Sequence, residues 1–328
     1  MLLLRVRLYW KNQRCWRKWE MIKIKVDVLN PGQFFACCGL LELSHRLWPG
    51  VEGHFSKCGS GYFFVIEPPP RGESNDVDLR CLLNKLCNCK VSGLTEEEQK
   101  ERSELEKKRS ELEKKRKELS ELEENRRKEL GEKAREGTLH LGEPFKLTLD
   151  WWQSEDEKAT LKTWAGRQEI HKIARAAQDA LKALLCNGKI DLCELLNHGC
   201  ILRTPAEYAQ KDRDQAKPVE PFCFDTRRYV HALKVGFSLD AQNTDILAYP
   251  AVELLALIGI QRFRLLPSGQ KWSFEYVIWL RPLGVPVAAA VASGVIPFVS
   301  SERYLFRFVF RDDQKRYKAF GRATKISN

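Results

Sequence analysis

Few features of an enzyme are present in this sequence of 328 residues. It contains no glycine-rich phosphate loop, no GxSxG nucleophile elbow and no dinucleotide-binding fingerprint. Its six histidines form no HxH, HD or HExxH pattern, so no two have the spacing of ligands to one metal. They are His45, His54, His140, His171, His198 and His231. We therefore predict a protein that binds rather than catalyses, with no cofactor and no metal.

Export and membrane signals are equally scarce. Arg5 and Arg7 interrupt the leucines at the start, and no small-residue cleavage site follows them. No run of eighteen or more residues is continuously apolar, so we expect no membrane span. Eleven cysteines in a chain without an export signal indicate reduced thiols and a cytoplasmic protein. The spacing of Cys58, Cys81, Cys87 and Cys89 lacks paired CxxC knuckles, so buried thiols are favoured and a zinc site is the alternative.

Methionine is rare as well. Met21 is the only one after Met1, and an alternating strand begins there, so we expect the native chain to start at Met21. Residues 1–20 would then be a non-native or disordered basic leader. The alternative is a basic arm that binds nucleic acid through its tryptophans, Trp10, Trp16 and Trp19.

Positive charge is in excess, with a formal net charge of +11. Residues 95–136 hold fourteen basic and fifteen acidic residues, and residues 1–20 hold six and one. The rest of the chain holds thirty-five basic and twenty-eight acidic residues, so most of the excess belongs to the folded body. This balance favours a polyanionic partner.

Two apolar segments predict the organisation of the chain. VDVLNPGQFFACCGLLEL at 26–43 and DILAYPAVELLALIGIQRFRL at 245–265 each enter an apolar helix through a proline. They align with Ala36 beside Ala256 and Gly39 beside Gly259. Together with the strand patterns around them, they predict an α+β fold of two ferredoxin-like (RAMP-like) halves.

The start of the first helix is a candidate binding site. Asn30 can cap this helix and Pro31 suits its first turn, which leaves the amides of Gly32, Gln33 and Phe34 for an anion or a partner. A purely structural role for Asn30, Gly32 and Gln33 is the alternative.

Residues 95–136 are almost entirely charged or polar, and SELEKKR occurs twice, at 103–109 and 110–116. Glutamates and lysines at i,i+4 spacing predict one long helix. One leucine per heptad is too few for a strong coiled coil. We interpret the segment as a solvated surface insertion, and an arm that contacts a partner is the alternative.

The remaining segments complete the predicted order. We expect strands at 51–56, 62–66, 145–151, 222–228, 233–239, 272–281, 304–311 and 316–326. We expect a helix at 157–186 and a short helical or irregular piece at 76–91. Tyr304, Phe306, Phe308 and Phe310 alternate on one strand and are predicted to face the core. The predicted units are 1–20, an N-terminal α+β half at 21–93, the charged insert at 94–136, a helical segment with a polar loop at 137–221, and a C-terminal half at 222–328.

Basic clusters outside the insert are the candidate nucleic-acid contacts, because cations pair with phosphates and aromatic rings stack on bases. On the 157–186 helix we expect Trp164 to share a face with cations, with a buried Trp164 as the alternative. The candidate residues are Trp164, Arg167, Lys172, Arg175, Lys182, Arg227, Arg228, Lys234, Arg262, Arg264, Lys315, Arg316 and Lys318.

Five segments together resemble one protein family. They are NPGQFFACCGLLEL at 30–43, KTWAGRQ at 162–168, FDTRRYVHALKVGFS at 224–238, YPAVELLALIGIQRFR at 249–264 and RDDQKRYKAFGRATKI at 311–326. The chain resembles the Csb3 family, small large-subunit-type proteins of type I-U (I-G) CRISPR systems. The resemblance covers most of 21–328 except the charged insert.

This resemblance implies a non-catalytic subunit of the Cascade RNA-guided DNA surveillance complex, in the large-subunit position, helping flanking-motif recognition and target DNA binding. The implied partners are the other subunits, guide RNA, target DNA and the helicase-nuclease recruited to the complex. Two ferredoxin-like (RAMP-like) halves would instead suit a backbone subunit that grips guide RNA. An endoribonuclease that processes guide RNA with His231 as base is the third interpretation.

Overall fold

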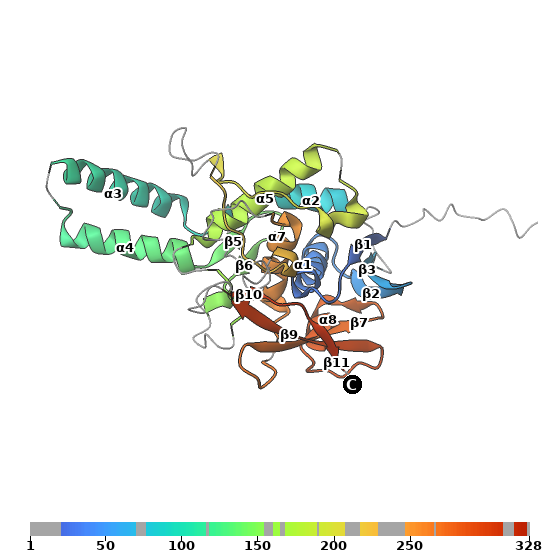
Figure 1. Cartoon of the computed structure of the whole chain (residues 1–328). Coiled ribbons are helices and arrows are strands. Elements are labelled where there is room, and N and C mark those ends of the chain that lie inside the picture. The colour runs from blue at the N-terminus through green and yellow to red at the C-terminus, as the bar shows by residue number, and fades with distance from the viewer. Residues whose placement is uncertain are drawn as a thin grey trace, which may run out of the picture.

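The computed structural model describes residues 21–69, 77–115, 118–153, 160–164, 168–188, 190–206, 217–228, 247–265, 267–310 and 318–326. These residues form an α+β structure of helices and antiparallel sheets (Figure 1). Arg167, His231, Lys234, Lys315 and Arg316 lie outside the described residues, as does the predicted strand at 233–239.

The N-terminal sheet follows the predicted β-α-β-β order. Its burial pattern alternates along β1, as expected for a strand with one buried face. β3 pairs antiparallel with both β1 and β2, and β8 of the C-terminal half extends the sheet beside β2. The elements are β1 (Ile22–Val26), α1 (Pro31–Leu47), β2 (Glu52–Cys58), β3 (Gly61–Glu67) and β8 (Leu283–Gly284).

The C-terminal sheet is built around the long strand β9. β7 pairs with β9 on one side, and β10 and β11 pair with it on the other. Tyr304, Phe306 and Phe308 are buried as predicted, whereas Phe310 is partly exposed. Helix α8, which the sequence analysis missed, precedes β9. The elements are β7 (Ser273–Trp279), α8 (Val285–Ala292), β9 (Ser301–Phe310), β10 (Lys318–Phe320) and β11 (Thr324–Ile326).

The two apolar helices, α1 and α7 (Pro250–Arg262), cross at the centre of the molecule (Figure 1). A Cβ atom on Gly39 would lie 2.0 Å from the carbonyl oxygen of Leu255, and one on Gly259 would lie 2.1 Å from that of Phe35. The two glycines therefore occupy equivalent positions, each against the residue four before the other. This reciprocity matches the alignment seen in the sequence, and glycine is required because the backbones touch.

The charged insert is a hairpin of two helices, so the prediction of one long helix was wrong. α3 spans Glu96–Lys114 and α4 spans Glu121–Glu136. Ser120 caps α4 and forms a capping box with Glu123, a helix-start signal in the S-E-L-E sequence that the i,i+4 pattern obscured. The hairpin extends away from the body (Figure 1), with Leu130 and Ala134 buried at its base against Leu94.

The structure also differs from the prediction at the start of α5 and at residues 222–228. Helix α5 begins at Ile170 rather than at 157, since residues 160–164 and 168–169 are not helical. Residues 222–228 form no strand but an irregular segment, with φ of 67° at Cys223, and a short 3-10 turn. The remaining elements are α2 (Leu79–Asn88), β4 (Val91–Ser92), β5 (Leu139–Leu141), β6 (Leu147–Leu149), η1 (Trp151–Gln153), α5 (Ile170–Cys186), η2 (Leu192–Asn197) and η4 (Thr226–Arg228).

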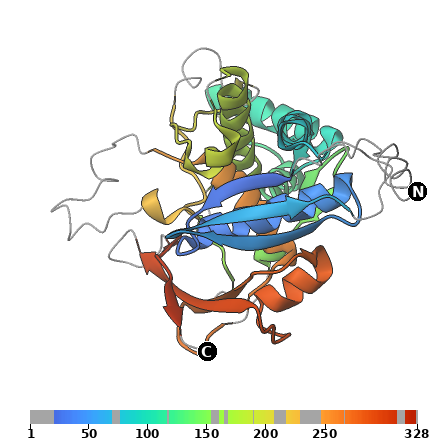
Figure 2. The ribbon, with the colours of Figure 1, turned by 90° about the vertical axis from the view of Figure 1, so that its right-hand side faces the viewer.

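One continuous hydrophobic core connects both halves, from Ile22 in β1 to Ala323 after β10. In Figure 2 the strands of the N-terminal sheet cross the middle of the molecule, with the C-terminal strands and α8 below them. Phe34 of α1 stacks on Tyr276 of β7 with ring centroids 4.4 Å apart. The C-terminal sheet therefore packs its inner face directly on the central helices.

Candidate nucleic-acid interface

The start of α1 is closed by the chain itself. Asn30 caps the helix as predicted, with its Oδ1 accepting a hydrogen bond from the Gly32 amide at 3.1 Å. Asn30, Gly32 and Gln33 are all buried. A Cβ atom on Gly32 would lie 2.3 Å from the carbonyl oxygen of Phe224. The described structure therefore supports the structural role of these residues and leaves their amides covered.

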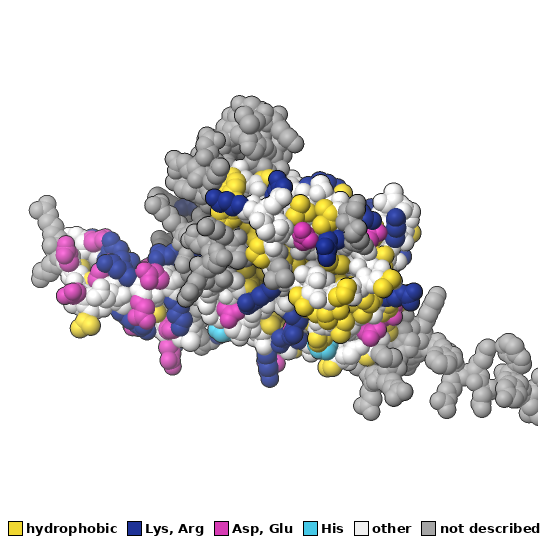
Figure 3. Space-filling view, turned by 90° about the horizontal axis from the view of Figure 1, so that it is seen from below, with side chains coloured by type: hydrophobic (Ala, Val, Ile, Leu, Met, Phe, Trp, Pro, Cys, Tyr) yellow, Lys and Arg dark blue, Asp and Glu magenta, His cyan; other side chains and the backbone are white. Residues whose placement is uncertain are grey.

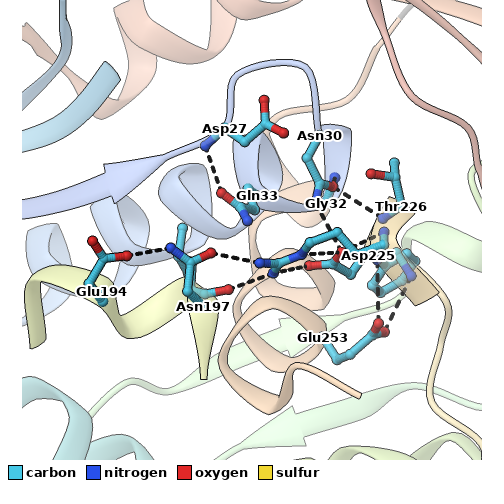
Figure 4. A network of polar contacts seen from close by, with 12 residues as sticks. Asp27, Asn30, Gly32, Gln33, Glu194, Asn197, Asp225, Thr226 and Glu253 are labelled. Carbon is cyan, nitrogen blue, oxygen red and sulfur yellow. Dashed lines mark hydrogen bonds and ion pairs between the residues drawn. The ribbon is translucent and has the colours of Figure 1, made fainter. Parts of the chain in front are cut away.

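A buried carboxylate lies beside the helix cap and bonds the side chain of Asn30. Asp225 is buried and accepts a hydrogen bond from Asn30 Nδ2 at 3.0 Å (Figure 4). Glu253, in the first turn of α7, is buried beside it and accepts from the amide of Phe224 at 3.3 Å. Segment 222–228 thus joins the N-terminal ends of both central helices.

Arg227 is part of this junction. Its guanidinium binds Asp225 in a bidentate pair, with Nε–Oδ1 2.9 Å and Nη2–Oδ2 2.6 Å. It also donates to Asn197 Oδ1 at 2.6 Å and to the carbonyl oxygen of Leu196 at 2.7 Å. The guanidinium carbon lies 3.5 Å from the ring centroid of Tyr249. These contacts hold η2 and η4 together. Arg228, the other predicted cation of this segment, is the last residue of η4.

Trp164 is a core residue. Its side chain is 4% exposed and lies outside the helix, so the expectation of an exposed stacking ring was wrong. It makes edge contacts with Trp151, Trp152 and Phe222 at centroid distances of 5.6, 5.7 and 5.2 Å. The local reason is that α5 begins only after this residue, so Trp164 is free to turn into the core.

The three predicted cations of α5 are all described, and each has a polar neighbour. Lys172 lies 3.3 Å from Glu169, Arg175 donates to Gln178, and Lys182 donates to Asn88 at 2.9 Å. Burial raises the pKa of the Cys87 and Cys89 thiols, and the charges of Lys182 and Arg175 partly offset this effect. Lys182 therefore links α5 to α2, whereas these contacts of Lys172 and Arg175 stay within α5 and its cap.

The two arginines at the end of α7 are similarly paired. Arg262 forms an ion pair with Glu42 of α1, whose side chain is 2% exposed. Burial alone would raise the pKa of Glu42, but the hydrogen bonds and charges of Arg262 and Arg46 lower it. Arg264 lies 3.5 Å from Asp150. Arg262 therefore compensates a buried carboxylate between the central helices.

Lys318 is the predicted cation with the most distinctive surroundings. Its Nζ lies 4.3 Å from the ring centroid of Trp272 and 5.4 Å from that of Phe308. Lys271 lies over the same indole at 5.8 Å. Trp272 is partly exposed, and its ring meets Phe308 and Phe310 edge to face. An aromatic surface and two cations thus meet at the β10 end of the C-terminal sheet.

A tight turn holds Trp272 in place. The turn from Pro267 to Phe274 folds back on itself, and the Trp272 carbonyl oxygen accepts the amide of Phe308 at 2.9 Å. Arg307 of β9 donates to Gln270 in the same turn. Trp272 has φ of 61°, in the left-handed region that bulky residues rarely adopt. Such strain is stored where the surrounding structure over-determines a side chain.

We call Lys271, Trp272, Arg307 and Lys318 the Trp272 cluster. Sequence reasoning found only Lys318 among these four. Since Phe306 and Phe308 face the core, strand alternation places Arg307 on the outer face, and this signal could have identified it. Trp272 had no such signal, because only the turn reveals that the ring stays near the surface.

The described residues contain no group of three or more His, Cys, Asp and Glu side chains that could hold a metal ion. Burial raises the pKa of Cys87 to about 12 and that of Cys89 to about 11. Cys58 is exposed on β2 and Cys81 is partly exposed on α2. Among the residues that the structure describes, no helix is long and apolar enough to cross a membrane.

Comparison with known proteins gave no relative: no family model, no curated protein and no solved structure matches the chain.

Proposed function

We propose that this protein is a non-catalytic nucleic-acid-binding subunit of a cytoplasmic, type I CRISPR RNA-guided DNA surveillance complex. In the large-subunit position, it would assist flanking-motif recognition and target DNA binding. The five segments that resemble the Csb3 family suggest the complex, and the net charge of +11 suits a polyanionic partner. Its partners would be guide RNA, target DNA, the other subunits and the recruited helicase-nuclease.

The observation that carries the binding function is the Trp272 cluster. Proteins that bind single strands combine aromatic surfaces for the bases with cations for the backbone. Lys318 and Lys271 lie over the indole of Trp272, and Arg307 contacts the same turn through Gln270. An extended strand could stack one base near Trp272 while the lysines neutralise its phosphates.

A backbone subunit that grips guide RNA is the second candidate. The β1-α1-β2-β3 unit has strand order β1-β3-β2, an arrangement found in the first half of a ferredoxin-like fold. The matching crossing of α1 and α7 supports two related halves. A backbone subunit would bind RNA without regard to sequence, whereas a flanking-motif reader would prefer one duplex sequence.

The Trp272 cluster can be tested by fluorescence anisotropy with labelled single-stranded RNA and with duplex DNA. Trp272→Ala should weaken binding by about tenfold, because stacking contributes about 1–3 kcal/mol per base, and Trp272→Phe should restore part of it. Lys271→Ala should weaken binding uniformly and reduce the salt slope by about one.

Lys57→Ala, at an exposed lysine on β2, is the matched control and should bind as the wild type does. Because Trp272 also contacts Phe308, thermal unfolding of each variant must accompany the binding curves. Wild-type affinity in a folded Trp272→Ala and Lys271→Ala pair would contradict the proposed binding site.

A further inference from the structure

The α8 region exposes an unusual number of aliphatic side chains. Residues 282–301 contain no charged side chain. Val287, Val295, Ile296 and Val299 are 47%, 64%, 44% and 103% exposed. Single exposed aliphatic residues are ordinary, but a group of them marks an interaction site. We call these four residues the α8 patch.

The residues of the α8 patch are distinct from those that α8 packs against the core. α8 buries Val285, Ala288, Val291 and Ala292 on the side that faces the body. Val287 of the same helix is exposed instead, and the remaining three residues follow the helix. The buried residues of α8 therefore already supply its contacts with the body, and the four residues of the α8 patch are left exposed.

Hydrogen bonds hold the α8 patch in a fixed shape. Gly294 ends α8 with φ of 76°, and its amide donates to the Val291 carbonyl oxygen at 2.9 Å. The Ile296 amide donates to the carbonyl of Ala290 at 3.3 Å, and the Leu280 amide donates to that of Ser300 at 2.8 Å. The loop is thus tied to α8 at one end and to the end of β7 at the other. A preorganised surface loses little conformational entropy on binding.

Basic side chains border the α8 patch. Next to Val299 lies an open depression of about 510 Å³, whose charged lining consists of Arg281, Glu302, Arg303 and Lys325. Glu302 is largely covered, since it accepts hydrogen bonds from Tyr62 at 2.7 Å and Tyr304 at 2.6 Å and pairs with Lys325. The underside of the molecule shows a broad hydrophobic area with basic side chains near it (Figure 3).

We infer that the α8 patch docks a different protein, one that presents aliphatic side chains bordered by Asp or Glu carboxylates. A second copy fits poorly, because the same surface would have to present both the arginines and the carboxylates that pair with them, and residues 282–301 contain no acidic side chain. A nucleic acid has no aliphatic surface to match four valine and isoleucine side chains. Membrane-surface segments favour Trp, Phe and Leu, which this group lacks.

The Trp272 cluster and the α8 patch lie toward opposite ends of β9. Trp272 contacts Phe308 and Phe310, whereas Val299 precedes Ser301. Eight to ten strand residues span roughly 30 Å. The protein can therefore hold a nucleic acid and a protein partner at once, and the two sites can be inactivated separately.

The test co-expresses the full chain with the proteins encoded by its neighbouring genes, digests nucleic acid with nuclease, and purifies through this chain. Val295→Ser with Val299→Ser should reduce the co-purified partner about tenfold or more, because two buried valines are lost from the contact. Arg281→Glu with Arg303→Glu should reduce it as well. Both double variants should keep wild-type affinity for single-stranded RNA, which separates this result from failure of the proposed function.

Leu122→Ser is the matched control, since Leu122 is 84% exposed on the α3–α4 hairpin, and it should leave the partner unchanged. Retention of the partner by both double variants would overturn the inference, as would a wild-type chain that purifies without a stoichiometric protein. So would a dimer of the chain alone that Val299→Ser dissociates, or binding to phosphatidylglycerol vesicles that Val299→Ser abolishes.

Discussion

The α1–α7 pair and the α3–α4 hairpin are two pairs of helices held together in opposite ways. α1 and α7 are buried on nearly all sides, and their backbones touch at Gly39 and Gly259. α3 and α4 are largely exposed and are joined by ion pairs such as Glu98–Lys133 at 2.6 Å. Close backbone packing holds α1 against α7, whereas ion pairs between side chains hold α3 against α4. Sequence changes, acid and salt should therefore affect them differently.

The largest expected effect comes from a methyl group at the crossing of the central helices. Gly39→Ala would place its Cβ 2.0 Å from the Leu255 carbonyl oxygen, which forces the two backbones apart. We expect a loss of about 3 kcal/mol or more in the free energy of unfolding, measured by denaturant titration.

Gly131→Ala is the matched change in α4, where a Cβ atom would meet nothing within 4 Å. It should stabilise the protein by up to about 1 kcal/mol, since alanine favours a helix more than glycine does. Equal effects of the two substitutions would remove the proposed difference between the helix pairs.

Acid should act next most strongly, at the base of the hairpin. Burial alone would raise the pKa of Glu169, but the hydrogen bond from Arg102, with the charges of Lys172, Arg102 and His171, lowers it to about 2. A depressed carboxyl pKa stabilises the fold above the unfolded value of 4.5, and this contribution, on the order of 3 kcal/mol, is lost as the pH falls toward 2. Burial also lowers the pKa of His171, so its protonation opposes folding in the same direction.

Hydrogen exchange at different pH values can measure this. As the pH falls below 4.5, amides of α3 and α4 should lose protection before those of α1 and α7. Arg102→Ala should raise the pH at which this loss begins, because the Glu169 carboxylate loses its bidentate partner. Simultaneous loss of protection in both helix pairs would contradict a locally attached hairpin.

The smallest effect is expected on the hairpin surface. Lys133→Met removes the ion pair with Glu98 and should cost about 0.5 kcal/mol or less, because exposed pairs are screened by water and salt. High salt should abolish the difference between variant and wild type in thermal unfolding. A loss of stability as large as that of Gly39→Ala would contradict this, because it would mean that a single ion pair holds α3 and α4 together as strongly as close packing holds α1 and α7.

Local sequence patterns predicted much of the fold. Alternation predicted β1, and the Asn30–Pro31 cap predicted the start of α1. The alignment of Gly39 with Gly259 marked two residues that the structure brings into reciprocal contact, although they lie more than two hundred positions apart. These features succeeded because capping and burial periodicity depend on a few neighbouring residues.

The errors occurred where distant segments compete with local preference. The i,i+4 charges favour a helix on both sides of Ser120, but packing of α4 against α3 makes a hairpin. Segment 222–228 has the composition of a strand, yet it forms a junction instead. Asp225 bonds the cap of α1 and Glu253 of α7, and Arg227 bonds η2. The apolar α8 segment lacks clear helical periodicity, because part of its surface faces outward.

By itself, the sequence determined the two apolar helices, the alignment of their glycines, the buried aromatic face of β9 and the basic balance of the body. Only the tertiary structure decided which cations are engaged: Arg227 and Arg262 compensate buried carboxylates, while Lys318 lies over a partly exposed tryptophan. The sequence around a charged residue does not reveal which distant group will pair with it. Its role is fixed by desolvation and by groups that folding brings near it from elsewhere in the chain.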